Sequence, residues 1–289
     1  MPSAKPLPSR WHRVSGENAW IMGVLNCTPD SFSDGGQFVK DQLNIDAALQ
    51  HALAMSEAGA SIIDVGGEST RPGAHPVPVD IEIARTVPVI KQLSQHGITT
   101  SIDTMKAEVM RHAIDAGATM VNDVTALTGD RESLAVVAET GVDLCLMHMQ
   151  GTPETMQQKP GYRDVLGEVC DYLQQRIEAC LKAGVSESSI MVDPGIGFGK
   201  RLEDNLDLIA GIETLKSRLG VPVLMGVSRK SFLGAITGAD VDARELETAA
   251  AVSICVYAGA DMLRVHHVEM QSRAVAVGSR LRDASLRLS

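Results

Sequence analysis

One repeated pattern constrains the fold of this 289-residue chain: a glycine that ends a helical stretch, followed at once by a short apolar run. The pattern occurs in EAGASIIDVGG, QHGITTSIDT, DAGATMVNDV, ETGVDLCLMH, KAGVSESSIMVDPG, RLGVPVLMGVS and YAGADMLRVH. Glycine after the last helical turn supplies the left-handed residue that ends a helix. Runs that are apolar on both faces are typical of buried parallel strands. An eighth apolar run, AWIMGVL at 19–25, precedes the other seven.

The stretches between these runs have helical spacing, most clearly at 46–58, 81–95, 202–219 and 247–258. Eight strands alternating with eight helices predict an α/β fold, a single (β/α)8 TIM barrel. An open doubly wound sheet fits the same alternation and stays as the alternative. Because no proline- or serine-rich linker interrupts the interior, we expect one domain over 19–289, preceded by an N-terminal extension over 1–18.

Composition narrows the partners and the compartment. The net charge of 26 − 36 = −10 argues against a nucleic acid or an anionic membrane as partner, although a few focused cations can still bind a small anion. The five cysteines have no CxxC or zinc spacing, and we find neither a signal peptide nor an apolar run of membrane-spanning length. These features predict a soluble cytoplasmic protein. With only 3% aromatic residues, the core must be built from aliphatic side chains and methionine.

Polar or charged groups follow all eight expected strands, whereas the turns at the opposite ends are short and rich in glycine and alanine. The groups are Asn26, the segment 66–71, Asp103, Asn122 with Asp123, His148, Asp193, the segment 228–230, and Arg264 with His266. In an α/β barrel the chemistry lies at the carboxyl ends of the strands. The asymmetry therefore predicts a site on that face.

One subset of these groups suits a heterocycle. Asp103, Asn122, Asp193 and Lys230 offer acceptors and donors at barrel depth, and a carboxylate there could accept the paired N–H groups of a pterin or purine edge. The alternative for any single aspartate is a structural carboxylate that neighbouring backbone groups satisfy.

A second subset is rich in donors and cations and suits an anion. Its members are Asn26, Arg71, Arg229, Lys230, Arg264 and His266. Arg264 and His266 are two residues apart on one strand, so both side chains point the same way and can bind one anion together. Surface ion pairs with the acidic excess are the alternative.

Three glycine-rich loops follow strands directly, at 28–36, 66–73 and 193–200. The last fails the P-loop pattern, because Pro194 and Arg201 stand where Gly and Ser or Thr are needed. We expect these loops to cover a ligand. All four phenylalanines lie in or just beyond loops after strands, where they could cover a flat ligand or fill gaps between strands and helices: Phe32, Phe38, Phe198 and Phe232.

Eight motifs in order, from about Trp20 to the C-terminal helix, resemble bacterial dihydropteroate synthase. They are MGVLNCTPDSFSDGG, IIDVGGESTRPGA, SIDTMKAEV, VNDVTAL, MHMQGTPETMQ, DPGIGFGK, GVSRKSFLG and LRVHHV. The resemblance implies a (β/α)8 barrel, a homodimer, bound Mg²⁺ and a defined reaction. In that reaction (7,8-dihydropterin-6-yl)methyl diphosphate and 4-aminobenzoate give 7,8-dihydropteroate and diphosphate. Cys27, where many members have valine, is a small departure that should affect only packing.

Residue roles also follow from the resemblance. It implies that Asp103, Asn122, Asp193 and Lys230 bind the pterin, and that Arg264 and His266 bind the diphosphate. It places Thr70 and Arg71 near the diphosphate and 4-aminobenzoate, Ser231 and Phe198 in the 4-aminobenzoate pocket, and Asn26 at Mg²⁺. The catalytic set it implies is Asp34, Arg71, Asp103 and Lys230.

Two rival functions share parts of this pattern. Pterin-dependent methyltransferases use a similar barrel with pterin-binding carboxylates, but they need no anion site, so STRPG, SRKS and RVH count against them. A paralogue that only holds pterin would be expected to lack some of the anion-binding residues, and all of them are present.

Overall fold

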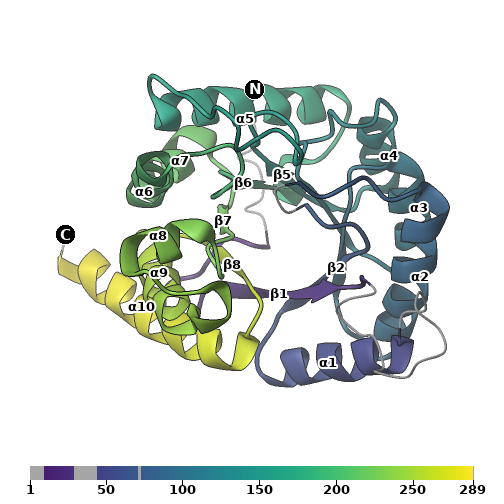
Figure 1. Ribbon diagram of the computed structural model, residues 1–289, viewed down its shortest axis with the longest axis horizontal. Helices are drawn as coiled ribbons and strands as arrows, with labels where there is room; N and C mark the ends of the chain where they lie inside the picture. Colours follow the sequence, from purple (N-terminus) through teal and green to yellow (C-terminus); the bar gives the residue numbers. More distant parts are fainter. Residues whose placement is uncertain (1–9, 29–43, 71–72, 289) are drawn as a thin grey trace, which may run out of the picture.

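The computed structural model describes residues 10–28, 44–70 and 73–288. Eight parallel strands form one sheet in the order β6-β5-β4-β3-β2-β1-β8-β7. A parallel bridge between Val192 and Val223, with Val192 N–H donating to the Pro222 carbonyl at 3.0 Å, brings the two edge strands together into a barrel. The predicted TIM barrel is confirmed and the open sheet is excluded. Figure 1 shows the helices surrounding the strands.

The strands are β1 (Trp20–Asn26), β2 (Ile62–Gly66), β3 (Thr100–Asp103), β4 (Met120–Asp123), β5 (Asp143–Met147), β6 (Ile190–Asp193), β7 (Leu224–Met225) and β8 (Met262–Val265). The α-helices are α1 (Ile45–Glu57), α2 (Val79–Gln95), α3 (Ala107–Asp115), α4 (Ser133–Thr140), α5 (Val165–Lys182), α6 (Leu202–Ala210), α7 (Ile212–Leu219), α8 (Ser231–Thr237), α9 (Glu245–Tyr257) and α10 (Val268–Leu288). Short 3-10 turns lie at Glu187–Ser189 and Val241–Ala243.

The glycines that suggested the repeat all have positive φ angles, as their position after a helix predicts: Gly59, Gly97, Gly117, Gly141, Gly184, Gly220 and Gly259. The stretch 202–219, expected as one helix, is two helices that meet at Gly211. A Cβ at Gly211 would lie 2.8 Å from the Leu166 side chain, so the junction packs directly on α5. The crossovers after β6 and β7 therefore each hold two helices rather than the single helix expected.

Methionines fill much of the barrel interior, as the low aromatic content predicted. Met22, Met120, Met191 and Met262 are fully buried in one cluster with Trp11. Trp11 meets Trp20 edge-on at 5.4 Å between ring centroids, and its indole N–H donates to Asp143 Oδ2 at 2.8 Å. The described part of the predicted N-terminal extension therefore packs on the base of the barrel, at the amino ends of the strands.

Candidate active site

A pocket opens at the carboxyl ends of the strands, on the face that the sequence predicted. Its walls are Thr70, Asp103, Asn122, Val124, Met147, Asp193, Ile196, Phe198, Gly226, Ser228, Lys230, Arg264 and His266. A concave site with a few converging polar groups is typical of small-molecule sites.

The pocket brings together eight of the residues predicted to bind substrate: Thr70, Asp103, Asn122, Asp193, Phe198, Lys230, Arg264 and His266. Ser231 is exposed as the first residue of α8 and is not part of the lining. Asn26 is half-buried at the end of β1, in register with Gly66, and also lies outside the lining. Asp34 and Arg71 lie outside the described residues, as do Phe32 and Phe38.

A charged network centred on Asp64, which the sequence analysis did not single out, joins buried residues to Asp103, Asn122 and Arg264 of the pocket lining. Asp64 is fully buried on β2 and accepts from Ser101 Oγ at 2.5 Å, Asn122 Nδ2 at 3.1 Å and Arg264 Nε at 2.6 Å. Arg264 Nη2 donates to Asp103 Oδ2 at 2.7 Å. The sequence signal that could have identified Asp64 is its place in an otherwise apolar strand, IIDVG. A carboxylate buried there needs a hydrogen-bonded or charged partner.

The predicted anion pair is therefore arranged differently from the sequence expectation. Arg264 and His266 both line the pocket, but Arg264 already bridges two carboxylates and His266 Nδ1 lies 2.9 Å from Ser228 Oγ. Although burial opposes the shift, Asp64 and Asp103 raise the pKa of Arg264, so it stays cationic. Arg229, also expected in the anion-binding set, is not part of the pocket lining; its Nε donates to Glu245 Oε1 at 2.6 Å.

The pocket carboxylates are held in a desolvated setting. Burial raises the pKa of Asp103 to about 7, with Arg264 opposing the shift and Asp64 adding to it. Burial also raises the pKa of Asp193, against a hydrogen bond from Gly195 N–H at 2.7 Å and the charge of Lys230. Such shifts mark sites where ligand groups complete the solvation of a charge.

Lys230 and Phe198 form one wall. Lys230 Nζ lies 4.1 Å from the centroid of the Phe198 ring, a distance at which a cation is attracted to the ring face. Phe198 therefore lies at the pocket, as predicted. Phe232 belongs to the buried core instead, which favours the packing alternative for that ring.

The glycine-rich loop 193–200 packs against the segment after β5. A Cβ at Gly195 would lie 1.9 Å from the His148 carbonyl oxygen, and one at Gly199 would lie 2.4 Å from that of Gln150. Lys200 Nζ lies 3.0 Å from His148 Nδ1. Burial lowers the pKa of Lys200 to about 7 and that of His148 to about 3. These glycines and His148 therefore hold two loops together.

Asp123, which the sequence placed beside Asn122 at a strand end, fits the structural alternative for an aspartate. Its carboxylate accepts from Thr125 N–H at 2.7 Å, Thr125 Oγ1 at 2.7 Å and Leu127 N–H at 3.0 Å. These bonds hold the turn after β4, where Ala126 and Leu127 adopt positive φ angles.

The chain is similar to known pterin-binding proteins in both sequence and structure. The family model described as "Pterin binding enzyme" matches residues 22–266. A dihydropteroate synthase of Synechocystis is 43% identical over 268 residues, covering 92% of this chain and 91% of the relative. A Xanthomonas albilineans dihydropteroate synthase solved with 4-aminobenzoic acid has a TM-score of 0.84 at 43% identity, covering 92% and 94% of the two chains. The enzyme from that organism in complex with 7,8-dihydropteroate has a TM-score of 0.81 at 40% identity, covering 93% and 95%.

Proposed function

The chain belongs to the pterin-binding enzyme family, and from that membership we propose how its pocket residues divide the work of the reaction. The reaction is that of dihydropteroate synthase in folate biosynthesis. The enzyme condenses (7,8-dihydropterin-6-yl)methyl diphosphate with 4-aminobenzoate and releases 7,8-dihydropteroate and diphosphate. The observation that supports it most is the convergence of buried carboxylates, Lys230 and Arg264 on one pocket.

The pterin ring binds deepest, against Asp103, Asn122, Asp193 and Lys230. An ionised carboxylate accepts two parallel N–H bonds from the amidine-like edge of the ring, and Asn122 offers both a donor and an acceptor. The raised pKa values of Asp103 and Asp193 support this assignment, because bound N–H donors replace water that these groups lost on burial.

The diphosphate lies at the cationic side of the pocket, near Arg264, His266 and the segment that carries Thr70 and Arg71. Arg264 uses Nε and Nη2 on Asp64 and Asp103, which fixes the plane of its guanidinium. The remaining N–H groups of a guanidinium can then donate to phosphate oxygens. Charge that develops on the leaving diphosphate is stabilised by these fixed donors.

Asn26, at the end of β1 and outside the pocket lining, would be the protein ligand of Mg²⁺. The ends of β1, β2 and β3 are adjacent, because Asn26 pairs with Gly66 and Gly66 pairs with Asp103. Among the described residues, no group of three or more His, Cys, Asp or Glu could hold a metal ion. Mg²⁺ in phosphate-binding sites typically uses one or two protein oxygens together with substrate phosphates. Bound there, the ion would neutralise charge on the diphosphate.

Bond breaking at the pterin methylene leaves positive charge on a carbon attached to an electron-rich ring. Asp103, and Asp34 from the segment after β1, favour that charge. The amine of 4-aminobenzoate is already neutral at pH 7, so it attacks without a strong general base. Phe198 and Thr70, which line the described pocket, would contact 4-aminobenzoate, and Ser231 stands next to Lys230 outside that lining. We expect 4-aminobenzoate to bind after the pterin and diphosphate.

A turnover assay tests the assignment. The purified chain, pterin diphosphate, 4-aminobenzoate and Mg²⁺ should give diphosphate and dihydropteroate in equal amounts. Binding of the pterin without turnover would contradict the synthase reaction. The ordered binding has its own test: 4-aminobenzoate should bind weakly until diphosphate or a pterin is present, and equal affinity without them would contradict the order.

A homodimer is supported by an apolar stripe on α10. Met270, Val277, Leu281 and Leu288 are exposed at spacings of seven, four and seven residues, and Ile254 is exposed on α9, which packs beside α10. Apolar residues at such spacing are typical of helices that pack against a partner helix. Light scattering should give twice the chain mass, and Leu281→Glu should give a monomer; a monomeric wild-type chain would contradict the dimer.

A cytoplasmic location is consistent with the thiols. Cys27, Cys145, Cys170, Cys180 and Cys255 are all free and buried, as expected in a reducing compartment. Within the described part of the chain, none of the helices has the length and apolar character needed to span a membrane.

A further inference from the structure

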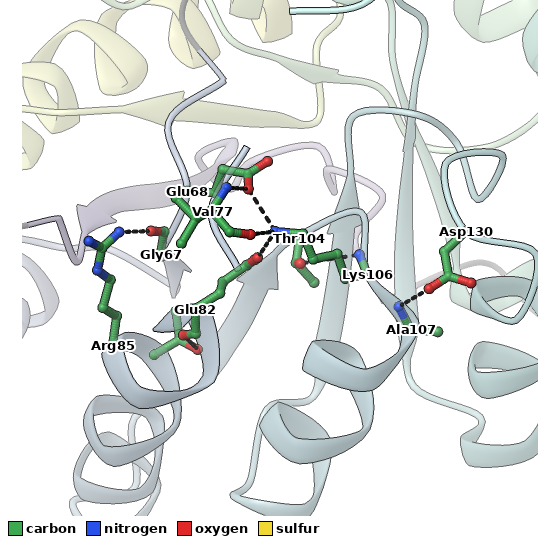
Figure 2. Close-up of polar contacts among 10 residues, drawn as sticks. Gly67, Glu68, Val77, Glu82, Arg85, Thr104, Lys106, Ala107 and Asp130 are labelled. Carbon is green, nitrogen blue, oxygen red and sulfur yellow. Dashed lines mark hydrogen bonds and ion pairs between the residues drawn. The ribbon is translucent and has the colours of Figure 1, made fainter. Parts of the chain in front are cut away.

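An ion cluster outside the pocket joins the ends of β2 and β3 to helix α2. Lys106 follows β3, three residues beyond Asp103. Its ammonium nitrogen lies 2.6 Å from Glu68 Oε2, 2.7 Å from the Val77 carbonyl oxygen and 2.5 Å from Glu82 Oε2. Figure 2 shows the three acceptors converging on this one nitrogen. An ammonium has three N–H donors, so every donor of Lys106 has an acceptor.

Two of these acceptors stand at the two ends of one segment. Glu68 precedes Thr70, a residue of the pocket wall, and Val77 follows it. Val77 N–H also donates to Glu68 Oε2 at 2.6 Å, so the ends are bonded to each other as well as to Lys106. The backbone before Thr70 is equally fixed: a Cβ at Gly67 would lie 2.8 Å from Thr86 Cγ2, and Arg85 donates to the Gly67 carbonyl at 3.0 Å.

Lys106 is the cation that offsets part of the negative charge of the two carboxylates in the cluster. The side chain of Glu82 is 1% exposed, that of Glu68 is 8% exposed, and that of Lys106 is 20% exposed. Within the described part of the chain Glu82 Oε1 has no hydrogen-bond partner, so this carboxylate depends on its ion pair. Burial opposes the shift, but Glu68 and Glu82 raise the pKa of Lys106, which keeps it charged at neutral pH.

We propose that Lys106 is a positioning residue for the reaction: by holding Glu68 and Val77 against α2 it places Thr70 at the pocket and thereby sets the affinity for 4-aminobenzoate, but not for the pterin. The inference rests on the proposed function of the pocket. The pterin residues are positioned independently, because Asp103 and Asn122 are paired in register within the sheet.

Loss of Lys106 gives a pH signature that simple destabilisation does not. Two buried carboxylates without a cation repel each other, so the pKa of one must rise. As pH falls, that group gains a proton and can hydrogen-bond to the other, which brings the segment back. Of the other charged groups nearby, Arg85 donates to the Gly67 carbonyl and Asp130 accepts from the Ala107 N–H at the start of α3. Asp103 pairs with Arg264 and also interacts with the charge of Glu82. His75, between Glu68 and Val77 in the sequence, is exposed.

The test compares Lys106→Met with Arg111→Met, which removes a cation from an exposed pair with Glu139. At pH 8 we expect Lys106→Met to raise the KM for 4-aminobenzoate at least about tenfold, since charge-assisted hydrogen bonds are lost. The Kd for a pterin that lacks the diphosphate should stay within about twofold of the wild-type value at the same pH. The KM, relative to the wild-type chain at each pH, should recover severalfold by pH 6. Arg111→Met should change neither quantity. Lys106→Arg, which keeps the charge, should restore part of the affinity.

Three outcomes overturn the proposal: an unchanged KM, an equal loss of pterin affinity, or a raised KM that does not respond to pH. If Lys106→Met does not fold, Glu68→Gln serves instead, because it weakens both bonds to the segment ends; its KM should rise about threefold without recovery in acid. An unchanged KM in Glu68→Gln would also overturn the proposal. Absent turnover by the wild-type chain would contradict the proposed function, whereas normal wild-type turnover beside an unaffected variant contradicts only the role of Lys106.

Discussion

Buried aspartates lie at the base of the barrel, where the strands begin, and at its mouth, where the strands end and the pocket opens. The protein supplies the two groups of carboxylates with different numbers of hydrogen-bond donors. At the base, Asp261 accepts from Arg13 N–H at 2.8 Å, Lys216 Nζ at 2.6 Å and Val223 N–H at 3.0 Å. At the mouth, Asp193 accepts from Gly195 N–H at 2.7 Å. The pKa of Asp261 is lowered by His12, Lys216 and Arg13 against the effect of burial, whereas burial raises the pKa of Asp193.

This difference separates charge that stabilises the fold from charge kept for a ligand. A carboxylate whose donors all come from the protein is stable when ionised, and its loss costs stability. A buried carboxylate with few hydrogen-bond donors from the protein lowers the free energy of unfolding, and a ligand that supplies N–H donors removes this cost. The base of the barrel should therefore control unfolding, and the mouth should control binding and turnover.

The largest expected effect is at the mouth. Lys230→Ala should lower kcat/KM by about 10²–10³-fold, because it removes a charged donor from the reacting pocket, and most of the loss should be in pterin affinity. Arg71→Ala should act mainly on the diphosphate and on 4-aminobenzoate. Steady-state kinetics together with pterin-binding titrations would distinguish the effect of Lys230→Ala on pterin affinity from the effect of Arg71→Ala on the other two groups. Equal losses of pterin affinity in both variants would contradict the division of the site.

The next largest effect is at the base. Trp11→Ala should lower the free energy of unfolding by about 3–5 kcal/mol, because it removes a buried ring and one of the donors to Asp143. At a temperature where the variant is folded, its kcat/KM should match that of the wild-type chain. Urea unfolding and kinetics measure both quantities. A large loss of activity in the folded variant would break the separation between base and mouth.

The two ends should also respond oppositely to pH. The raised pKa of Asp103 means that the folded state holds this proton more tightly, so its contribution to stability is present in acid and is lost as pH rises from 3.8 to about 7. The lowered pKa of Asp261 gives stability that is present above its ordinary pKa and lost as pH falls through the lowered value.

Urea unfolding measured at a series of pH values tests both predicted directions of the change in stability. Asp103→Asn should remove the decline between pH 3.8 and about 7, and Asp261→Asn should remove part of the decline in acid. Pterin affinity of the wild-type chain should fall as pH drops below about 7, because protonated Asp103 no longer accepts two N–H bonds. Affinity that rises in acid would contradict the role of Asp103.

The smallest effects come from two phenylalanines that the sequence placed in equivalent positions. Phe198→Leu should raise the KM for 4-aminobenzoate a fewfold and leave stability unchanged, since the ring lies at the pocket with Lys230. Phe232→Leu should lower the free energy of unfolding by about 1 kcal/mol and leave KM unchanged, since that ring is buried in the core. Similar behaviour of the two variants would remove the distinction.

The sequence predicted the barrel because its signals are local. Gly59 or Gly220 ends a helix by its own backbone geometry, and the polar residue after each strand falls on one face once the strands are parallel. Contacts between distant segments were beyond this reasoning. Asp64 meets Arg264 across 200 residues of sequence, and no spacing rule connects the two.

The dependence on contacts between distant segments also explains why the positions of some single residues were not predicted. Ser231 and Asn26 stand beside strand ends in the sequence, but the start of α8 exposes Ser231 and the register of β1 places Asn26 outside the lining. Lys106 reads as an ordinary residue before a helix, and its role depends on Glu68 and Glu82 reaching it from another segment.

The most direct test of the separation between base and mouth compares one buried aspartate from each end. Asp193→Asn and Asp261→Asn change the same atoms in equally buried settings, and each variant is measured for its Kd for pterin diphosphate and its free energy of unfolding. Asp193→Asn should lose at least about tenfold in affinity at unchanged or increased stability, and Asp261→Asn should lose stability by about 1–3 kcal/mol at unchanged affinity. The reverse pattern, or equal losses of both quantities in both variants, would contradict the account.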